Sequence, residues 1–229
     1  MKWCVLPLSI LVGVSCFAAA VQAEIIRDTM EFDQTPRRYT LYVPDSYDGS
    51  QAWPLVINMH GAGTYASDQM NWTNMNSVAD AGQFLVVYPQ ALGSPPMWND
   101  SDWNSGVDDV GFINSLLDEL GQSYRLDSSK TYAMGFSQGG AMSYALGAEL
   151  SDRIAAIASV SGPNTFNPTA SRPLPVALVH GTADSIVPIE GGIVAGVGIQ
   201  VPPIADVVAA WRESNHCSEN VLVTQVPDT

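Results

Sequence analysis

Hydrophobic residues in this chain gather in short runs that polar turns separate. Residues 38–44 alternate in the way of a half-buried strand, and the turn residues of Pro44–Gly49 end that strand. Later runs have the length of strands and almost no polar alternation, which indicates strands covered on both faces. These continuous runs are Pro54–His60, Phe84–Gln90, Thr131–Phe136, Ile154–Ser161 and Pro175–His180.

Helical patterns lie between and after these runs. We expect helices over Val110–Tyr124, Gln138–Leu150 and Ile204–Glu213. The third follows Pro202 and Pro203, and proline suits the first turn of a helix. Strands that alternate with helices predict an α/β fold, with a mostly parallel, doubly wound sheet and helices on both faces. In such sheets, ligands bind at the carboxyl ends of the strands.

The first 23 residues have the pattern of a secretory signal peptide. Lys2 precedes a long apolar run, and small residues stand three and one positions before Glu24. We therefore expect residues 24–229 to form a single catalytic domain that is secreted, either extracellular or periplasmic. Two alternatives remain, which are a retained anchor helix and a lipoprotein attached through Cys16.

Charge narrows the classes of partner. The chain has 9 Lys and Arg residues against 23 Asp and Glu residues, a formal net charge of −14. Such a protein repels phosphate backbones and anionic lipid headgroups, so we expect neither nucleic acid nor a membrane surface as a partner. Three widely separated histidines give no metal-binding spacing. We expect a monomer without metal or cofactor.

The strongest chemical signal is the sequence GFSQG at residues 135–139. A predicted strand runs into it and a predicted helix runs out, which is the setting of a nucleophile elbow. Such a turn forces Ser137 into strained backbone, and a side chain at either glycine would clash with the crossing strand and helix. The hydroxyl would stand at a helix N-terminus, where developing negative charge is favoured. Ser137 is the predicted nucleophile; a structural serine in a glycine-rich turn is the alternative.

A serine nucleophile also needs hydrogen-bond donors for the oxyanion that it creates. The loop His60–Gly63 closes the first central strand, where hydrolases of this architecture place one donor. We predict that the backbone N–H groups of Gln138 and Ala62 are the donors, with Gly63 as a substitute for Ala62. His60 itself is interpreted as a brace for this loop.

The acid and the base of a triad should follow in the order Ser, Asp, His. Asp184 lies in the loop after the last predicted strand, where a carboxylate can hold a histidine through its Nδ1–H. Capping of a turn is the other interpretation of Asp184, and His180 is interpreted as structural. His216 is the candidate base that follows, although its position at a helix C-terminus is also typical of a helix-end residue.

The C-terminal region gives two signs of an incomplete chain. Residues 221–226 resemble a strand that has just begun, and removal of the signal peptide leaves Cys217 without a partner. We therefore expect the chain to be a fragment. A buried free thiol is the other interpretation of Cys217.

Three segments, together with the serine turn and the aspartate loop, resemble the secreted polyhydroxybutyrate depolymerase/feruloyl esterase family of α/β-hydrolases. The segments are RYTLYVP at 38–44, HGAG at 60–63 and VDDVGFI at 107–113. The likeness runs from about Arg37 to Cys217. It implies the α/β-hydrolase fold and a serine esterase that acts through an acyl-enzyme. The implied substrates are polyhydroxyalkanoate oligomers, or feruloyl and acetyl groups on plant polysaccharide.

The resemblance also implies roles for particular residues. By position, Ser137 is the nucleophile, Asp184 the triad acid, and Ala62 and Gln138 belong to the oxyanion loop. The family's histidine lies in a Gly-rich, Trp-containing segment that has no match here, and the family usually has Gly where His216 stands. Members often pair the cysteine at the position of Cys217 with a later one. Two rivals therefore stay open: a peptidase on the same fold, and an inactive α/β-hydrolase that only binds ligand.

Two further sets of residues have more than one interpretation. Trp98 and Trp103 lie in the loop of residues 94–104, where they could stack on a sugar or a feruloyl ring or pack inward. Asp108 and Asp109 could act as paired carboxylates. We favour a structural role for them, because two aspartates at a helix start suit the helix dipole.

Overall fold

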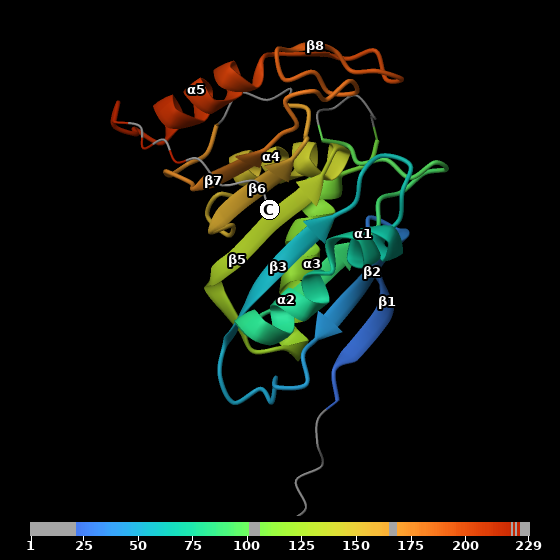
Figure 1. Cartoon of the computed structure of the whole chain (residues 1–229). Coiled ribbons are helices and arrows are strands. Elements are labelled where there is room, and N and C mark those ends of the chain that lie inside the picture. Colours follow the sequence, from blue (N-terminus) through green and yellow to red (C-terminus); the bar gives the residue numbers. More distant parts are fainter. Residues whose placement is uncertain (1–21, 101–105, 165–168, 221, 223, 225–229) are drawn as a thin grey trace, which may run out of the picture.

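The computed structural model of the chain describes residues 22–100, 106–164, 169–220, 222 and 224 (Figure 1). Within them, seven strands form one sheet in the order β1-β2-β4-β3-β5-β6-β7. The strands are β1 (Glu24–Phe32), β2 (Thr35–Val43), β3 (Trp53–Met59), β4 (Leu85–Pro89), β5 (Leu126–Phe136), β6 (Ala156–Val160) and β7 (Val176–Val179). The helices are α1 (Ala66–Thr73), α2 (Met75–Gly82), α3 (Asp109–Ser123), α4 (Gln138–Glu149) and α5 (Ile204–Ser214).

The sheet confirms the predicted α/β architecture. β1 and β2 form an antiparallel hairpin, β2 also pairs antiparallel with β4, and all pairings from β4 through β7 are parallel. The hydrophobic pattern did not predict β1, because this edge strand is mostly exposed and buries little. α1 and α2 were also not predicted, nor was the small antiparallel ribbon of β8 (Gly192–Ile193) and β9 (Gln200–Val201).

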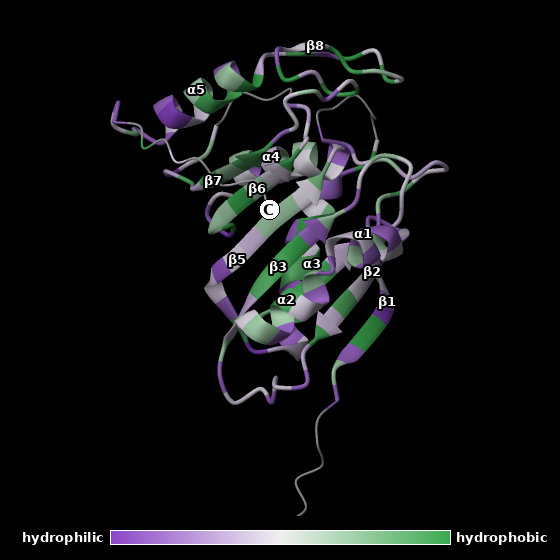
Figure 2. Cartoon of the chain, in the orientation of Figure 1, coloured by the Kyte–Doolittle hydropathy of each residue, from purple (hydrophilic) through white to green (hydrophobic). Residues whose placement is uncertain are grey.

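Helices cover both faces of the sheet, and the side chains of β4 show why its sequence is continuously apolar. Leu85 and Val87 pack into the main core with α3 and α4, while Val86 and Tyr88 pack with α1 and α2 on the other face. Successive side chains of a strand point to opposite faces, so a strand between two helical layers needs apolar residues throughout. The central strands are accordingly hydrophobic along most of their length (Figure 2).

A buried ion pair joins the second strand to the third helix. The Arg37 side chain donates to the Asp109 carboxylate, and both residues are 1% exposed. The Arg37 guanidinium also lies 3.8 Å above the centre of the Phe112 ring. The other carboxylate oxygen of Asp109 accepts the backbone N–H of Asn99 at 2.7 Å. Asp109 therefore links β2, α3 and the loop that precedes α3.

The neighbouring aspartates serve different partners. Asp108 caps α3 by accepting the backbone N–H of Gly111 at 2.7 Å, while Asp109 turns inward to Arg37. The structural interpretation of this pair is confirmed, since the two carboxylates do not converge on a common point. The predicted signal peptide lies almost wholly outside the described residues. In the described part of the chain, no helix is long and apolar enough to cross a membrane.

We expect Asp109→Ala to lower the free energy of unfolding by about 3–5 kcal/mol, because it leaves the Arg37 charge buried without a partner. The double substitution Arg37→Met/Asp109→Leu should recover most of that loss, since it removes both charges. Asp118→Ala, which removes the exposed partner of Arg153 from the same helix, is the matched control and should cost about 1 kcal/mol or less. Urea unfolding of the four proteins measures these differences. A loss in Asp109→Ala no larger than in the control would contradict the prediction.

Candidate active site

Ser137 stands at the sharp turn from β5 into α4. Its backbone has φ 53° and ψ −121°, a conformation that non-glycine residues rarely adopt. Backbone hydrogen bonds hold it there: the N–H of Ser137 donates to Val160 at 2.8 Å, and its carbonyl accepts the N–H groups of Gly140 and Ala141 at 2.8 and 3.1 Å. The predicted strained turn is confirmed, with a half-buried serine at the N-terminus of a helix.

The glycines of the turn are required by close crossings of backbone. A Cβ atom at Gly135 would lie 2.3 Å from the carbonyl carbon of Gly139, and one at Gly139 would lie 2.2 Å from the carbonyl oxygen of Met59. Neither contact is possible, so the first turn of α4 approaches β5 and the end of β3 only through glycine. This confirms the clash that the sequence predicted at both positions.

The loop after β3 lies directly against the serine. A Cβ atom at Gly61 would be 3.3 Å from the Cβ of Ser137. The N–H of Gly63 donates to the carbonyl of Pro96 at 2.8 Å, so the idea that Gly63 could replace Ala62 as a donor is wrong. The N–H groups of Ala62 and Gln138 have no acceptor among the described residues. Both remain available for a ligand.

Ser137, Gln138 and Ala62 line one pocket of about 50 Å³. Most of its remaining wall is apolar, and four of the side chains come from the segment after Asp184. The hydrophobic pattern did not predict this wall, although the repeated Val and Ile residues after position 184 could have indicated it. The other lining residues are Met97, Asp100, Pro163, Val187, Val194, Val197 and Ile199.

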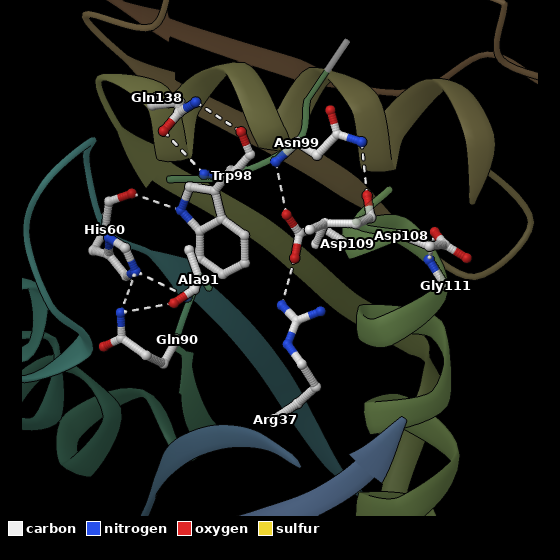
Figure 3. Close-up of polar contacts among 11 residues, drawn as sticks. Arg37, His60, Gln90, Ala91, Trp98, Asn99, Asp108, Asp109, Gly111 and Gln138 are labelled. Atoms are coloured by element: carbon white, nitrogen blue, oxygen red, sulfur yellow. Dashed lines mark hydrogen bonds and ion pairs between the residues drawn. The ribbon is translucent and has the colours of Figure 1, made fainter. Parts of the chain in front are cut away.

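The Gln138 side chain fixes the loop that carries Trp98 (Figure 3). Its Oε1 accepts the backbone N–H of Trp98 at 3.0 Å, and its Nε2 donates to the Trp98 carbonyl at 2.8 Å. The indole N–H of Trp98 donates to the His60 carbonyl at 2.9 Å, and Trp98 is fully buried. The hypothesis that Trp98 stacks on substrate is therefore wrong, because the ring is buried in the interior and no substrate can reach it. Trp103 lies outside the described residues.

His60 braces the same region from beneath, as predicted. Its Nδ1–H donates to the carbonyl of Gly61 at 2.8 Å, and its Nε2 accepts the backbone N–H of Ala91 and the side-chain amide of Gln90, both at 3.1 Å. Burial lowers the pKa of His60, so the imidazole is held neutral. With both nitrogens occupied and no exposed surface, His60 cannot exchange protons with a substrate.

Asp184 occupies a tight turn after β7. Its Oδ1 accepts the backbone N–H groups of Ile186 and Val187, each at 2.9 Å. Burial acts to raise the pKa of Asp184, but hydrogen bonds from these two N–H groups and from the Ser161 side chain outweigh it and hold the pKa below its usual range. The Nε2–H of His180 donates to the Val187 carbonyl at 2.7 Å and lies 3.7 Å from Asp184 Oδ2. His180 thus supports the loop, and Asp184 is a charged carboxylate.

The structure does not bring His216 into the site. His216 is exposed just beyond α5, with φ 53°, and its N–H donates to the Glu213 carbonyl at 3.0 Å. All three histidines lie in the described part of the chain, and none of them lines the pocket that holds Ser137.

Cys217 is exposed, so its interpretation as a buried thiol is wrong. No cluster that could hold a metal ion occurs within the described ranges.

We predict that Gly139→Ala costs about 3 kcal/mol or more, because the added methyl overlaps backbone atoms of β3. Gly121→Ala is the matched control: Gly121 lies within α3 with no atom within 4 Å of a new Cβ. That change should stabilise the protein by about 0.5–1 kcal/mol. Thermal and urea unfolding compare the two variants. Equal effects from both would show that the crossing tolerates a side chain.

Stability should depend on the neutral state of His60. Since burial lowers its folded pKa, the stabilisation is complete above the unfolded pKa of about 6.5 and is lost as pH falls below it. As pH falls, the free energy of unfolding should therefore decline more steeply in wild type than in His60→Gln. The two slopes should differ by up to about 1.4 kcal/mol per pH unit. Urea unfolding between pH 7.5 and 5, buffer values chosen around that pKa, measures both slopes. His216→Gln is the control, and parallel slopes in wild type and His60→Gln would refute the expectation.

Curated relatives match the chain over part of their length. This chain is 33% identical over 134 residues to a bifunctional acetylxylan esterase/xylanase from Neocallimastix patriciarum, a match covering 58% of this chain and 19% of that protein. It is 30% identical over 166 residues to a probable feruloyl esterase C from Aspergillus clavatus, covering 69% of this chain and 58% of the relative. The chain therefore spans between about a fifth and three fifths of these relatives.

Solved structures share the fold. A ferulic acid esterase from Anaeromyces mucronatus, in complex with ferulic acid, superposes with a TM-score of 0.61 at 17% identity, over 86% of this chain and 80% of its own. A thermostable esterase superposes with a TM-score of 0.64 at 20% identity, over 83% of this chain and 52% of that one. Residues 47–197 match the model of a family described as phospholipase/carboxylesterase. This chain, with its α/β-hydrolase fold, belongs to the phospholipase/carboxylesterase family.

Proposed function

We propose that this protein is a secreted serine esterase that removes feruloyl or acetyl groups from plant polysaccharide. One observation carries the proposal: Ser137, in a strained turn, lines a small pocket together with Ala62 and Gln138, whose backbone N–H groups have no acceptor among the described residues. Similarity to feruloyl and acetylxylan esterases supports the ester class. The apolar wall of the pocket suits an uncharged acyl group.

The reaction follows from these positions. The Oγ of Ser137 attacks the ester carbonyl while its proton passes to a base, and the oxyanion accepts hydrogen bonds from the N–H groups of Gln138 and Ala62. The N-terminal end of α4 adds a favourable field for this negative charge. The C–O bond to the alcohol then breaks, and the alcohol takes the proton. Water attacks the resulting acyl-enzyme in the same way and releases the acid.

The proton acceptor in this proposal is a histidine that Asp184 orients. The turn around Asp184 holds its carboxylate in one place and keeps it charged, as a partner for an imidazolium requires. No histidine of residues 1–229 lines the serine pocket. We propose that the histidine lies outside these residues, as the family resemblance implies. We also propose a monomer without cofactor, in which residues 1–23 direct export.

Ser137→Ala, made in the complete protein that the gene encodes, should reduce turnover of 4-nitrophenyl acetate at least about 10³-fold, because no other group in the pocket can form the acyl-enzyme. Ser128→Ala changes an exposed serine of β5 and is the matched control. A fluorophosphonate probe should label wild type at Ser137, as mass spectrometry of the peptide would show. Undiminished turnover in Ser137→Ala overturns the proposal. An unlabelled but folded wild type would favour the rival, a protein that only binds ligand.

Hydrolysis of a set of esters by the same complete protein identifies the preferred acyl group. Methyl ferulate, acetylated xylan and oligomers of 3-hydroxybutyrate differ in size and planarity, and the pocket must accept one better than the others. We expect higher kcat/KM for the polysaccharide-type esters than for the hydroxybutyrate oligomers. A preference for the oligomers would instead assign the protein to polyester hydrolysis.

A further inference from the structure

A second hollow opens beside the edge of the sheet. It is a groove of about 540 Å³ between the β1-β2 hairpin, the start of α1 and the loop that follows β4. Figure 1 shows these three parts side by side. Two arginines, Arg27 and Arg38, line it, together with the exposed ring of Tyr65. We call it the arginine groove.

These two arginines differ from the other basic residues. The structure describes eight of the nine Lys and Arg residues. Six of the eight bind a carboxylate or a carbonyl oxygen: Arg37, Arg125, Lys130, Arg153, Arg172 and Arg212. Arg27 and Arg38 are exposed, and their side chains make no hydrogen bond or ion pair with any described residue. In a chain of net charge −14, two free guanidinium groups in one groove are unusual.

The strand register brings the two guanidinium groups to one face. Thr40 is paired with Arg27, and Thr29 is paired with Arg38. Side chains opposite each other in an antiparallel pair share a face, so the two arginines are diagonal neighbours about 7–8 Å apart at the backbone. The same face continues into Tyr42, which packs against α1 and α2. Both arginines therefore extend over the side of the sheet on which α1 lies.

One carboxylate, that of Asp28, also lines the groove. Asp28 follows Arg27 directly along β1, so its side chain points to the opposite face of the sheet from the two arginines. The register pairs Asp28 with Tyr39 across the hairpin. Burial raises the pKa of Tyr39 to about 12, and the Asp28 carboxylate adds to the rise. Asp28 also accepts the N–H of Thr29 at 2.7 Å. Glu31 follows on the same face of β1 but does not line the groove and makes no ion pair with a described residue.

The arginine groove borders the serine pocket. Ala62 and Met97 line the pocket, while Tyr65 and Pro96 line the groove. A hydrogen bond from the N–H of Gly63 to the carbonyl of Pro96 joins the two loops that carry these residues. A polymer whose ester group enters the pocket can therefore continue across these two joined loops into the groove.

We propose that the arginine groove binds a uronate carboxylate on the polysaccharide that carries the ester. Guanidinium groups bind carboxylates through paired N–H donors, and the Tyr65 ring offers an apolar face to a sugar. The net negative charge of the protein repels an anionic polymer elsewhere on its surface. An anionic sugar should therefore bind at the arginine groove, where two guanidinium groups have no partner. The proposal rests on the proposed function for its polymer, and its test is by binding alone.

Equilibrium binding to the complete protein carrying Ser137→Ala tests it, with two probes of matched length: a xylo-oligosaccharide that bears glucuronate and one that bears none. We expect tighter binding of the acidic probe, a preference that falls as salt rises. Adding Arg27→Gln and Arg38→Gln should weaken binding of the acidic probe by about 5- to 10-fold. Lys130→Gln with Arg212→Gln makes the same change in net charge at other sites and should leave the preference intact.

Equal affinity of the two probes for the parent protein would overturn the proposal, as would an unchanged preference in the Arg27/Arg38 variant. Equal weakening by the control variant would also overturn it, because general charge would then explain the effect. Thermal unfolding of each variant checks the fold. Binding needs no turnover, so failure of the esterase proposal would appear separately, as unlabelled Ser137 or as undiminished hydrolysis in Ser137→Ala.

Discussion

The close crossing of α4 over the ends of β3 and β5 is the constraint on which the site depends. Backbone meets backbone there at Gly135 and Gly139, where even a methyl group would overlap another chain segment. The crossing leaves only a sharp turn between strand and helix, and that turn holds Ser137 in strained backbone. It also brings Gln138, the first residue of α4, and Ala62 of the loop after β3 to one small pocket. The strained serine turn and the pocket beside it thus follow from the packing of the sheet.

A buried polar network keeps the loops around this crossing in place. The Gln138 side chain holds both backbone groups of Trp98, the indole of Trp98 holds the His60 carbonyl, and His60 holds the loop after β4. Further along, the N–H of Asn99 reaches Asp109, whose other oxygen faces Arg37. Each buried group would be costly without its partner, so the network allows one arrangement of the loops and disfavours others.

The serine pocket and the arginine groove complement each other chemically. The serine pocket is small and mainly apolar, which suits an acyl group, whereas the arginine groove is open and carries unpaired cations, which suits an anionic sugar. A single wall of two hydrogen-bonded loops separates them. An ester-bearing polymer could engage both at once, and binding energy gained in the groove would then position the ester in the pocket.

The sequence by itself determined the alternation of strands and helices, the serine turn and the positions of Asp184 and the His60 loop, because these depend on local apolar pattern and on glycine chemistry. Tertiary structure alone decided that Trp98 is buried and that His216 lies away from Ser137. It also decided that the N–H of Gly63 donates to the carbonyl of Pro96 and is not free for a ligand. It also decided that Arg27 and Arg38 share a groove while Arg37, next to one of them, is buried against Asp109. Which partner a polar group meets depends on segments far apart in the chain, and no local pattern contains that information.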